Sequence, residues 1–497
     1  MNSSNLYLKR EKDWRNGAIV YQVLVDRFAP SNDILQKLSL YQKPKKLMSW
    51  NELPKPGPFL EDVKYCAHEL EYWGGDLKSL LENLDYIKNL NVDVLYLNPI
   101  HYSLSNHKYD ASNYLQISPE YGSFEDLKKL SDKVHQDNMK IMLDGVFNHV
   151  GVSSPLFQEA KDPKSPKRQW FDFNPKYADG VRLWADVKSL PELNLENQEV
   201  RDYIYQADDS VIKTYLKLGM DGWRLDVAFD LGFEVLAELT AAAHEQKPGS
   251  MVVGEIWNYP KDWFKSIDGV MNFTFREIIF RVIKEQIEPA RAMQMFTQVI
   301  HDSGIENILK SWTLLDNHDV PRLIDQLPND KDQQLAQILQ FTLPGSPNLY
   351  YGTELGMTGG IDPMNRAPMR WDLNTKNNPY LVWTQSLIHL HQNERALKIG
   401  DYVPLLTKQL IGYERKTDDV SDTVIILLNP STKSVTEDVL IPDSKLMNYS
   451  DFITLKGNAK SVQLIAGILH LTIEPKSYVI LKPKTSPSKS YTPYKRV

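Results

Sequence analysis

Short apolar runs recur along the first three quarters of the chain, and each has about the length of a β-strand. Most are apolar on both faces, as strands buried in a parallel sheet are. Amphipathic stretches with apolar residues at helical spacing lie between them, at residues 77–90, 124–138 and 199–219. This repeated alternation of strand and helix predicts an α/β fold, a (β/α)8 TIM barrel. The predicted strands are residues 18–25, 92–100, 140–150, 220–229, 251–257, 268–273, 311–319 and 346–352.

Two stretches depart from this alternation. One follows the third predicted strand and is rich in proline, lysine and aromatic residues, which predicts a small inserted domain. The other begins after residue 396, where apolar residues alternate at 423–431, 461–473 and 477–483. This pattern predicts a C-terminal antiparallel β-sandwich domain. The predicted division is barrel at 1–147 and 192–395, inserted domain at 148–191, C-terminal domain at 396–484 and a polar disordered tail at 485–497.

Composition narrows the class of protein. The 497 residues carry a net charge of −7, and an acidic chain does not suit nucleic acid, because neutralising phosphates needs a basic face. No apolar run approaches ~18 residues, so no membrane span is predicted. The N-terminal residues lack the apolar segment of a signal peptide, and the single cysteine, Cys66, allows no intrachain disulfide. We therefore expect a cytoplasmic protein, with a secreted form that has lost its signal as the alternative.

Acidic residues stand at the ends of several predicted strands. Asp144, Asp226, Glu255 and Asp319 each lie near the end of an otherwise apolar run. In a (β/α)8 barrel the catalytic residues lie where the strands end, at one face of the barrel. A single such acid is equally well explained as a helix cap or a loop salt bridge, but acids on several strands of one barrel converge on one cavity. Partial desolvation of a carboxylate is costly, so this arrangement needs a functional reason.

Two of these acids have contrasting neighbours. Arg224 lies two residues before Asp226, so both side chains leave the strand on the same face. A nearby guanidinium favours an ionised carboxylate, which suits a nucleophile. Glu255 has apolar neighbours, and a carboxyl group in such a setting tends to keep its proton, which suits a general acid. Two carboxylates in opposed environments are typical of glycoside hydrolysis.

At these residues the chain resembles the α-amylase family of glycoside hydrolases, from about residue 15 to residue 395. The matching segments occur in the family's order and are DGVFNH (144–149), DGWRLD (221–226), GEIW (254–257) and DNHD (316–319). The resemblance implies Asp226 as the nucleophile that forms a covalent glycosyl-enzyme. It also implies Glu255 as the general acid/base and Asp319 as the third carboxylate, which binds sugar hydroxyls.

The resemblance further implies a set of substrate-binding residues. Arg224 matches the arginine that holds the nucleophile, and Tyr109, within NHKYDASNY (106–114), matches the tyrosine that stacks on the sugar being cleaved. Asp362 and Arg366 match an acid–arginine pair at the non-reducing end of the substrate. The full set is His107, Tyr109, His149, Arg224, His318, Asp362 and Arg366.

Within the family, the chain is most similar to neopullulanases, cyclomaltodextrinases, maltogenic amylases and the neighbouring α-glucosidases. The segments that carry this similarity are YQVLVDRFA (21–29), GGDLKSLLENLDYI (74–87) and GMTGGIDPMNRAPMRWD (356–372). The chain departs from the group in having VAFD at 227–230, where VANE is frequent. The barrel also begins within the first ~20 residues, without the N-terminal β domain through which these relatives dimerise, so both a monomer and a homodimer are considered.

The resemblance leaves the metal question open. No cofactor is required by the predicted chemistry, but calcium is possible. In LPELN (190–194), Glu192 stands where true amylases carry an acidic calcium ligand, and Asn148 would be its companion. The alternative, in which no calcium binds and Asn148 bonds the backbone, is equally consistent with the sequence.

We therefore predict a retaining glycosidase that cleaves α-glucosidic bonds, mainly α-1,4, in maltooligosaccharides, cyclodextrins or related short glucans. A glucanotransferase or sugar isomerase would use the same three carboxylates and is the main alternative. A non-catalytic binding protein of the same fold would usually have lost carboxylates that this chain keeps. The motifs do not separate exo from endo attack, nor do they define the preferred chain length or linkage.

Overall fold

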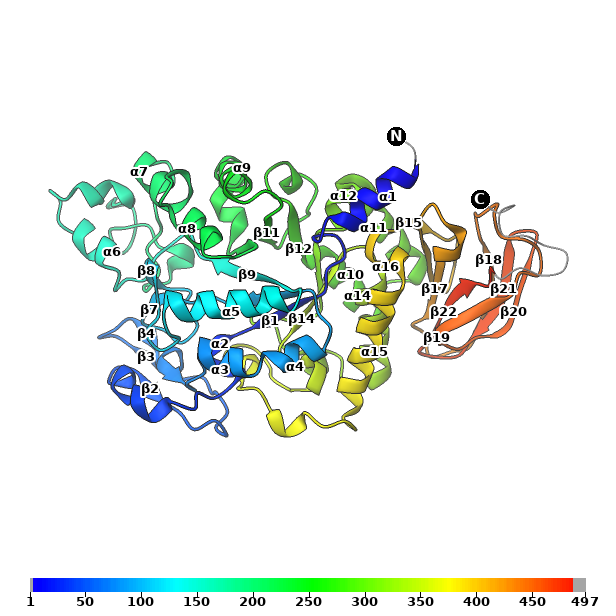
Figure 1. The fold of residues 1–497 in the computed structure, drawn as a ribbon, viewed down its shortest axis with the longest axis horizontal. Helices are drawn as coiled ribbons and strands as arrows, with labels where there is room; N and C mark the ends of the chain where they lie inside the picture. Colours follow the sequence, from blue (N-terminus) through cyan, green and yellow to red (C-terminus); the bar gives the residue numbers. More distant parts are fainter. Residues whose placement is uncertain (1–2, 486–497) are drawn as a thin grey trace.

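The computed structural model describes residues 3–485, and its centre is a closed barrel of eight parallel strands (Figure 1). The order around the barrel is β1-β14-β13-β12-β11-β10-β9-β6. Each strand lies inside the range predicted for it, so the barrel prediction is confirmed. The strands are β1 (Val20–Val23), β6 (Val94–Leu97), β9 (Lys140–Gly145), β10 (Gly222–Leu225), β11 (Met251–Ile256), β12 (Gly269–Asn272), β13 (Trp312–Leu314) and β14 (Ser346–Tyr350).

The barrel strands are buried on both faces because they separate two cores. Alternate residues such as Val20, Met142 and Val253 fill the barrel interior. Their neighbours, such as Tyr21 and Leu143, belong to the larger core between the strands and the outer helices. This is why the strands have almost no polar face in the sequence.

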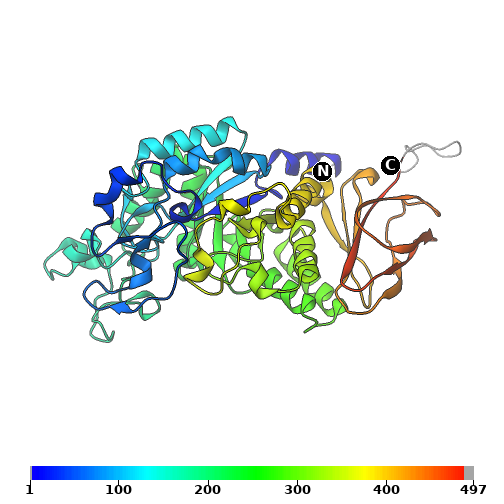
Figure 2. The same cartoon turned by 90° about the horizontal axis from the view of Figure 1, so that it is seen from below.

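Helices surround the barrel (Figures 1 and 2). The Ser123 side chain caps the helix at 124–136 as an N-cap residue, accepting the N–H of Asp126 at 3.3 Å. The α-helices outside the inserted region are α1 (Ser3–Lys12), α2 (Val25–Phe28), α3 (Leu77–Glu82), α4 (Leu84–Asn89), α5 (Phe124–Gln136), α7 (Gln198–Arg201), α8 (Val211–Lys217), α9 (Ala228–Gln246), α10 (Phe273–Ile283), α11 (Pro289–Ser303), α12 (Ile305–Ile308), α13 (Leu323–Gln326), α14 (Asp330–Thr342), α15 (Pro379–Asn393) and α16 (Arg395–Ile399). None of the helices in the described residues is long and apolar enough to cross a membrane.

Two helices expected to be continuous are interrupted. The segment at 77–90 divides at Asn83, whose side-chain amide donates to the Ser79 carbonyl at 2.8 Å. The segment at 199–219 divides after a π-helical turn, because Ala207 is extended (φ −63°, ψ 156°). Two aspartates and a serine follow Ala207, and such residues compete with helix by bonding nearby backbone groups.

A long excursion between β1 and α3, residues 30–75, was not predicted. It contains the 3-10 helix η1 (Ile34–Tyr41), the strand pair β2 (Lys46–Leu47) and β5 (Glu71–Tyr72), and the hairpin of β3 (Phe59–Leu60) and β4 (Tyr65–Cys66). A second small hairpin, β7 (His101–Ser103) and β8 (Ala111–Ile117), follows β6. In Figure 1 the excursion and this hairpin lie at the same end of the barrel.

The segment after β9 holds the predicted insertion, with α6 (Pro155–Ala160) and the 3-10 helices η3 (Pro166–Trp170) and η4 (Trp184–Asp186). Isolated backbone bridges link His149 with Glu192, Phe171 with Leu193 and Leu183 with Pro191, so the beginning and the end of the insertion meet. Figures 1 and 2 show the insertion at the opposite end of the molecule from the C-terminal domain.

The C-terminal domain is the predicted antiparallel β-sandwich. A five-stranded sheet has the order β15 (Asp401–Pro404), β16 (Ile411–Lys416), β17 (Val424–Asn429), β22 (Ser477–Pro483) and β19 (Phe452–Gly457), and a three-stranded sheet has the order β18 (Val435–Leu440), β21 (Ile468–Ile473) and β20 (Lys460–Ile465). Residues of both sheets share one apolar core. The run at 461–473 is two strands, because Ala466 and Gly467 turn the chain with φ of +48° and +80°. Beyond residue 485, the predicted disordered tail lies outside the described residues.

Candidate active site

Arg224 is the centre of a cluster of three carboxylates at the end of the barrel strands. On β10 it lies opposite Asp144 of β9 in the strand register. Its Nη1 atom lies 2.9 Å from Asp144 Oδ1 and 2.9 Å from Asp226 Oδ1, and its Nη2 atom lies 3.1 Å from Glu255 Oε2. The contact expected between Arg224 and Asp226 is therefore present, and the same guanidinium also reaches the proposed acid/base.

This cluster holds more negative charge than one arginine can balance. Burial, together with the nearby Glu255 carboxylate, raises the pKa of Asp226 well above its ordinary value, and the Arg224 guanidinium only opposes this rise. The expectation that Arg224 would keep Asp226 ionised thus missed the effect of burial. Close carboxylates disfavour one another's ionised forms, which is why Glu255 adds to the effect of burial on Asp226.

The surroundings of Glu255 differ from the apolar setting expected from the sequence. Its Oε2 atom accepts the backbone N–H of Val227 at 2.8 Å, and its Oε1 atom accepts the indole N–H of Trp257 at 2.7 Å. Val227 has φ +40°, a left-handed conformation that is rare for a β-branched residue. These two donors fix the orientation of the carboxyl group.

His318 and Tyr109 form a parallel pair of rings beside the cluster, with ring centroids 5.1 Å apart. Tyr109 Oη lies 2.8 Å from Asp144 Oδ2 and 2.6 Å from His318 Nε2. Tyr109 donates to Asp144 Oδ2, so its oxygen is left to accept from His318 Nε2–H. Gln22 donates to His318 Nδ1 at 2.9 Å, and burial lowers the pKa of His318, so this ring is neutral.

Two further histidines contact the backbone of Tyr109. His107 Nδ1 accepts the Tyr109 N–H at 3.1 Å, and His107 Nε2 lies 3.1 Å from Glu69 Oε1. His149 Nε2 lies 3.1 Å from the Tyr109 carbonyl oxygen, and burial lowers the pKa of His149 to about 4. The ring of His149 stacks on Trp184 of the insertion, with centroids 5.4 Å apart.

Asp319 also contacts His318 and is open to solvent, with 30% of its side chain exposed. His318 Nε2 lies 3.2 Å from Asp319 Oδ2. Arg366 connects Asp319 to Asp362. The Nη2 atom of Arg366 lies 3.6 Å from Asp319 Oδ1, and its Nη1 atom lies 3.3 Å from Asp362 Oδ2. All ten residues predicted for catalysis and substrate binding thus lie in one connected network.

The comparison with known proteins agrees with this geometry. Residues 22–419 match the family described as alpha amylase, catalytic domain. The chain belongs to the α-amylase family. It is 31% identical over 432 residues to a cyclomaltodextrinase of Bacillus sp, covering 84% of this chain and 73% of that protein. It is also 31% identical over 487 residues to neopullulanase 2 of Thermoactinomyces vulgaris, covering 94% and 78% of the two chains.

Solved structures of the family share the whole architecture. The native debranching enzyme of Nostoc punctiforme is 30% identical, with a TM-score of 0.79, and the match covers 95% of this chain and 99% of that one. Cyclic α-maltosyl-(1→6)-maltose hydrolase of Arthrobacter globiformis shares the fold at 24% identity, with a TM-score of 0.78 over 95% and 99% of the chains. The chain is thus an α-amylase family glycosidase, as its sequence predicted.

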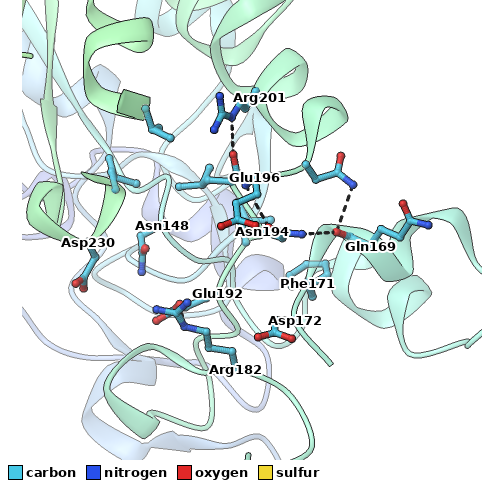
Figure 3. Close-up of a pocket in the computed structure, with 15 residues that line it drawn as sticks. Asn148, Gln169, Phe171, Asp172, Arg182, Glu192, Asn194, Glu196, Arg201 and Asp230 are labelled. Atoms are coloured by element: carbon cyan, nitrogen blue, oxygen red, sulfur yellow. Dashed lines mark hydrogen bonds and ion pairs between the residues drawn. The ribbon is translucent and has the colours of Figure 1, made fainter. Parts of the chain in front are cut away.

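The donors around Glu192 do not fit a calcium ion. A pocket of about 770 Å³ is lined by residues that include Asn148, Arg182, Glu192 and Asp230 (Figure 3). Glu192 Oε2 lies 2.5 Å from Arg182 Nε, and Asn148 Nδ2 lies 3.4 Å from His149 Nδ1. Across the described residues, no group of three or more His, Cys, Asp or Glu could hold a metal ion. Calcium prefers several carboxylate and carbonyl oxygens, whereas here a guanidinium already pairs with the acid.

Several residues of this α-amylase family site were not predicted. Tyr96 Oη donates to Asp144 Oδ2 at 2.5 Å, and Asn98 Nδ2 donates to Tyr109 Oη at 2.8 Å. Positions 96 and 98 share one face of the strand, so the alternation that placed Arg224 beside Asp226 would have found them. Glu69 had no such signal, because it reaches His107 from the unpredicted excursion.

Proposed function

We propose that this α-amylase family glycosidase hydrolyses α-1,4-glucosidic bonds of cyclomaltodextrins and short maltooligosaccharides, with retention of the anomeric configuration. The similarity to a cyclomaltodextrinase and a neopullulanase over most of both chains supports the substrate class. The single observation that carries the mechanism is the Arg224 guanidinium in contact with both Asp226 and Glu255. It holds a nucleophile and an acid side by side, as retaining glycosidases require.

In the proposed first step, Asp226 attacks the anomeric carbon while Glu255 gives its proton to the departing glycosidic oxygen. The C–O bond of the glycoside breaks, and a covalent ester forms between the sugar and Asp226. In the second step Glu255 takes a proton from water, whose oxygen attacks the same carbon and releases Asp226.

The proposed sugar-binding residues surround this bond. Tyr109 offers its ring for stacking, and its fixed pairing with His318 keeps that ring in place. Asp319, open to solvent, is free to accept sugar hydroxyls. Asp362 and Arg366 form the end of the network and are proposed to bind the non-reducing end of the substrate.

Two variants test the proposal. Asp226→Asn and Glu255→Gln should each reduce hydrolysis of β-cyclodextrin and maltotriose by several orders of magnitude. Asp132→Asn is the matched control and should keep full activity. Asp132 is exposed on α5, where its carboxylate pairs with Lys128. NMR of the first product should show the α anomer. Near-normal turnover in either variant, or a β anomer formed first, would refute the assignment.

Transglycosylation is a second candidate activity, favoured by one observation. Trp257 donates to Glu255 Oε1, yet 46% of its surface is exposed and its ring lies 3.7 Å from that of Phe273. An exposed indole beside the acid/base is suited to stack an acceptor sugar in place of water. Chromatography at high maltotriose should therefore show longer products, and Trp257→Ala should reduce them relative to glucose and maltose.

We propose that this activity requires no calcium. The Arg182 guanidinium already pairs with Glu192, the acid that would otherwise be available as a calcium ligand. EDTA should therefore leave both the melting temperature and the rate of maltotriose hydrolysis unchanged, and added calcium chloride should raise neither. A fall with EDTA that calcium reverses would contradict this proposal.

We also propose that the enzyme acts in the cytoplasm on imported oligosaccharides. The intracellular maltogenic amylase of Bacillus subtilis supports this, being 32% identical over 393 residues that cover 78% of this chain and 63% of that protein. Fractionation of the native cells tests it, with activity expected in the cytosolic fraction. Analytical ultracentrifugation would distinguish a monomer from a homodimer.

A further inference from the structure

Lys108 is a fully buried lysine between two proposed sugar-binding residues. It lies in the segment 104–110, here called the sugar-contact loop, with 0% of its surface exposed. Its Nζ atom lies 3.1 Å from Tyr72 Oη and 3.5 Å from Glu120 Oε2. The rings of Tyr72 and Tyr121 lie 4.8 and 5.0 Å from it, so the ammonium is enclosed by two aromatic faces and one carboxylate.

The partner carboxylate is an ionised anchor outside the loop. Burial alone would raise the pKa of Glu120, but Lys108 and Lys45 together lower it to about 2. Ser118 Oγ donates to the same carboxylate at 2.7 Å, and Lys45 pairs with it from the excursion at 30–75. Removal of one partner from a charge pair this well enclosed is strongly destabilising, because the other charge stays buried and unpaired.

The backbone of Lys108 is held in an unfavourable conformation. Its φ is +66°, in the left-handed region that a residue with a side chain seldom adopts. Its N–H donates to Ser105 Oγ at 3.0 Å, and the next N–H, of Tyr109, donates to His107 Nδ1. A strained backbone persists only where surrounding contacts over-determine it, and the buried ammonium is the largest such contact here.

We propose that Lys108 is a positioning residue for sugar binding. Its ammonium, held by Glu120, Tyr72 and Tyr121, keeps the sugar-contact loop in the conformation that presents His107 and Tyr109 to the substrate. The inference rests on the sugar-binding role proposed for those two residues. Release of the ammonium allows φ of Lys108 to relax to a negative value, which turns the two neighbouring side chains away from their present directions.

The test compares Lys108→Met, Lys108→Gly and Lys108→Arg with Lys213→Met. Lys213 of α8 is the matched control, because it is 6% exposed, pairs with Glu245 of α9 at 3.2 Å and takes no part in the network of predicted site residues. With maltotriose as substrate, Lys108→Met should lower kcat/KM by about 10²-fold, mainly through KM, because a misplacement of about 1 Å is costly at such sites and His107 and Tyr109 are proposed to bind the sugar. Lys108→Arg should recover most of this loss, since a guanidinium also binds aromatic faces and carboxylates.

The glycine variant separates backbone conformation from the side-chain anchor. Glycine adopts φ +66° freely but has no ammonium, so Lys108→Gly should behave like Lys108→Met. Wild-type kinetics in Lys108→Gly would overturn the proposal, as would equal changes of KM in Lys108→Met and Lys213→Met. If Lys108→Met does not fold, the double variant with Glu120→Gln removes both buried charges and must still raise KM.

Tyr109→Ala distinguishes failure of this inference from failure of the proposed function. If Tyr109→Ala binds and hydrolyses maltotriose normally, the proposed sugar-binding role is wrong, and the role of Lys108 fails with it. If Tyr109→Ala is impaired while Lys108→Met keeps its wild-type KM and kcat, only the positioning role is wrong.

Discussion

The backbone N–H of Val227 donates to Glu255 Oε2 at 2.8 Å, so the residue after the proposed nucleophile binds the proposed acid/base. Val227 makes this bond with φ +40° and with its side chain almost fully buried. Left-handed backbone costs a β-branched residue roughly 1–3 kcal/mol. The strained backbone of Val227 therefore holds the carboxyl group of Glu255 at a fixed position relative to Asp226, the residue that precedes Val227.

The first prediction concerns this bond. Val227→Gly should keep kcat for maltotriose within about threefold of wild type, because glycine reaches φ +40° without strain and retains the N–H. Val227→Pro should lose activity by orders of magnitude, since proline has no N–H and its φ is fixed near −65°. Steady-state kinetics on variants shown to be folded by circular dichroism measures both. Equal loss in the two variants would mean that the valine side chain, and not its N–H, matters.

The second prediction concerns the shape of Arg224. Its guanidinium contacts Asp144, Asp226 and Glu255 at once, which a lysine ammonium cannot do. Arg224→Lys should therefore lower kcat by roughly 10²–10³-fold and lower the melting temperature, because a buried carboxylate loses its partner. Arg281→Lys is the control and should change neither kcat nor the melting temperature. Arg281 is exposed and pairs with Glu277 at 2.7 Å. A kcat near wild type in Arg224→Lys would show that one positive charge is sufficient.

The barrel was predictable because its strands carry an unusually simple signal. Strands buried on both faces form apolar runs, and polar residues in such runs stand out, as Arg224 does on β10 and Asp226 does just after its end. Two-residue alternation then placed both side chains on one face, and the structure confirms their contact. The matched motifs placed the remaining carboxylates, which local pattern alone could not pair.

The structure of the excursion at 30–75 could not be predicted from hydrophobic periodicity. It is built from two-residue strands and two 3-10 helices, which leave no periodicity in the sequence. Its contacts with the site, such as Glu69 with His107 and Tyr65 with Asp110, join residues about 40 positions apart in the chain. The setting of Glu255 was misjudged for a related reason, because a backbone N–H in a rare conformation has no sequence signature.

The third prediction concerns Asp230, the last residue of the VAFD segment at 227–230. Trp184 of the insertion donates its indole N–H to Asp230 Oδ2 at 3.0 Å, and its ring stacks on His149. Asp230→Ala should free the indole and raise KM for maltotriose by about threefold to tenfold, the value of one exposed hydrogen bond, with kcat unchanged.

Two further variants check this reading of Asp230. Asp230→Asn keeps an acceptor oxygen and should retain the wild-type KM, whereas Trp184→Phe keeps the ring but loses the N–H and should match Asp230→Ala. A fall in kcat without a change of KM in Asp230→Ala would instead place Asp230 in the chemical step.

The fourth prediction concerns the stability of the C-terminal domain. Glu414 on β16 is fully buried, and neither of its carboxyl oxygens has a hydrogen-bond partner among the described residues. Burial raises its pKa from an ordinary value of 4.5 to about 7, with Lys416 opposing the rise. The folded state therefore binds this proton more tightly than the unfolded state does. Between pH 4.5 and 7 the contribution of Glu414 to stability falls as pH rises, and the full penalty is present above pH 7.

Glu414→Gln removes this penalty, because the amide is neutral at every pH. The melting temperature of Glu414→Gln should exceed that of wild type by a few degrees at pH 8, and the difference should disappear near pH 4.5, as scanning fluorimetry across that range would measure. Glu234→Gln, whose side chain is 77% exposed, should show no such pH-dependent gain. A gain that is equal at pH 4.5 and pH 8 would come from packing of the amide and would contradict a raised pKa at Glu414.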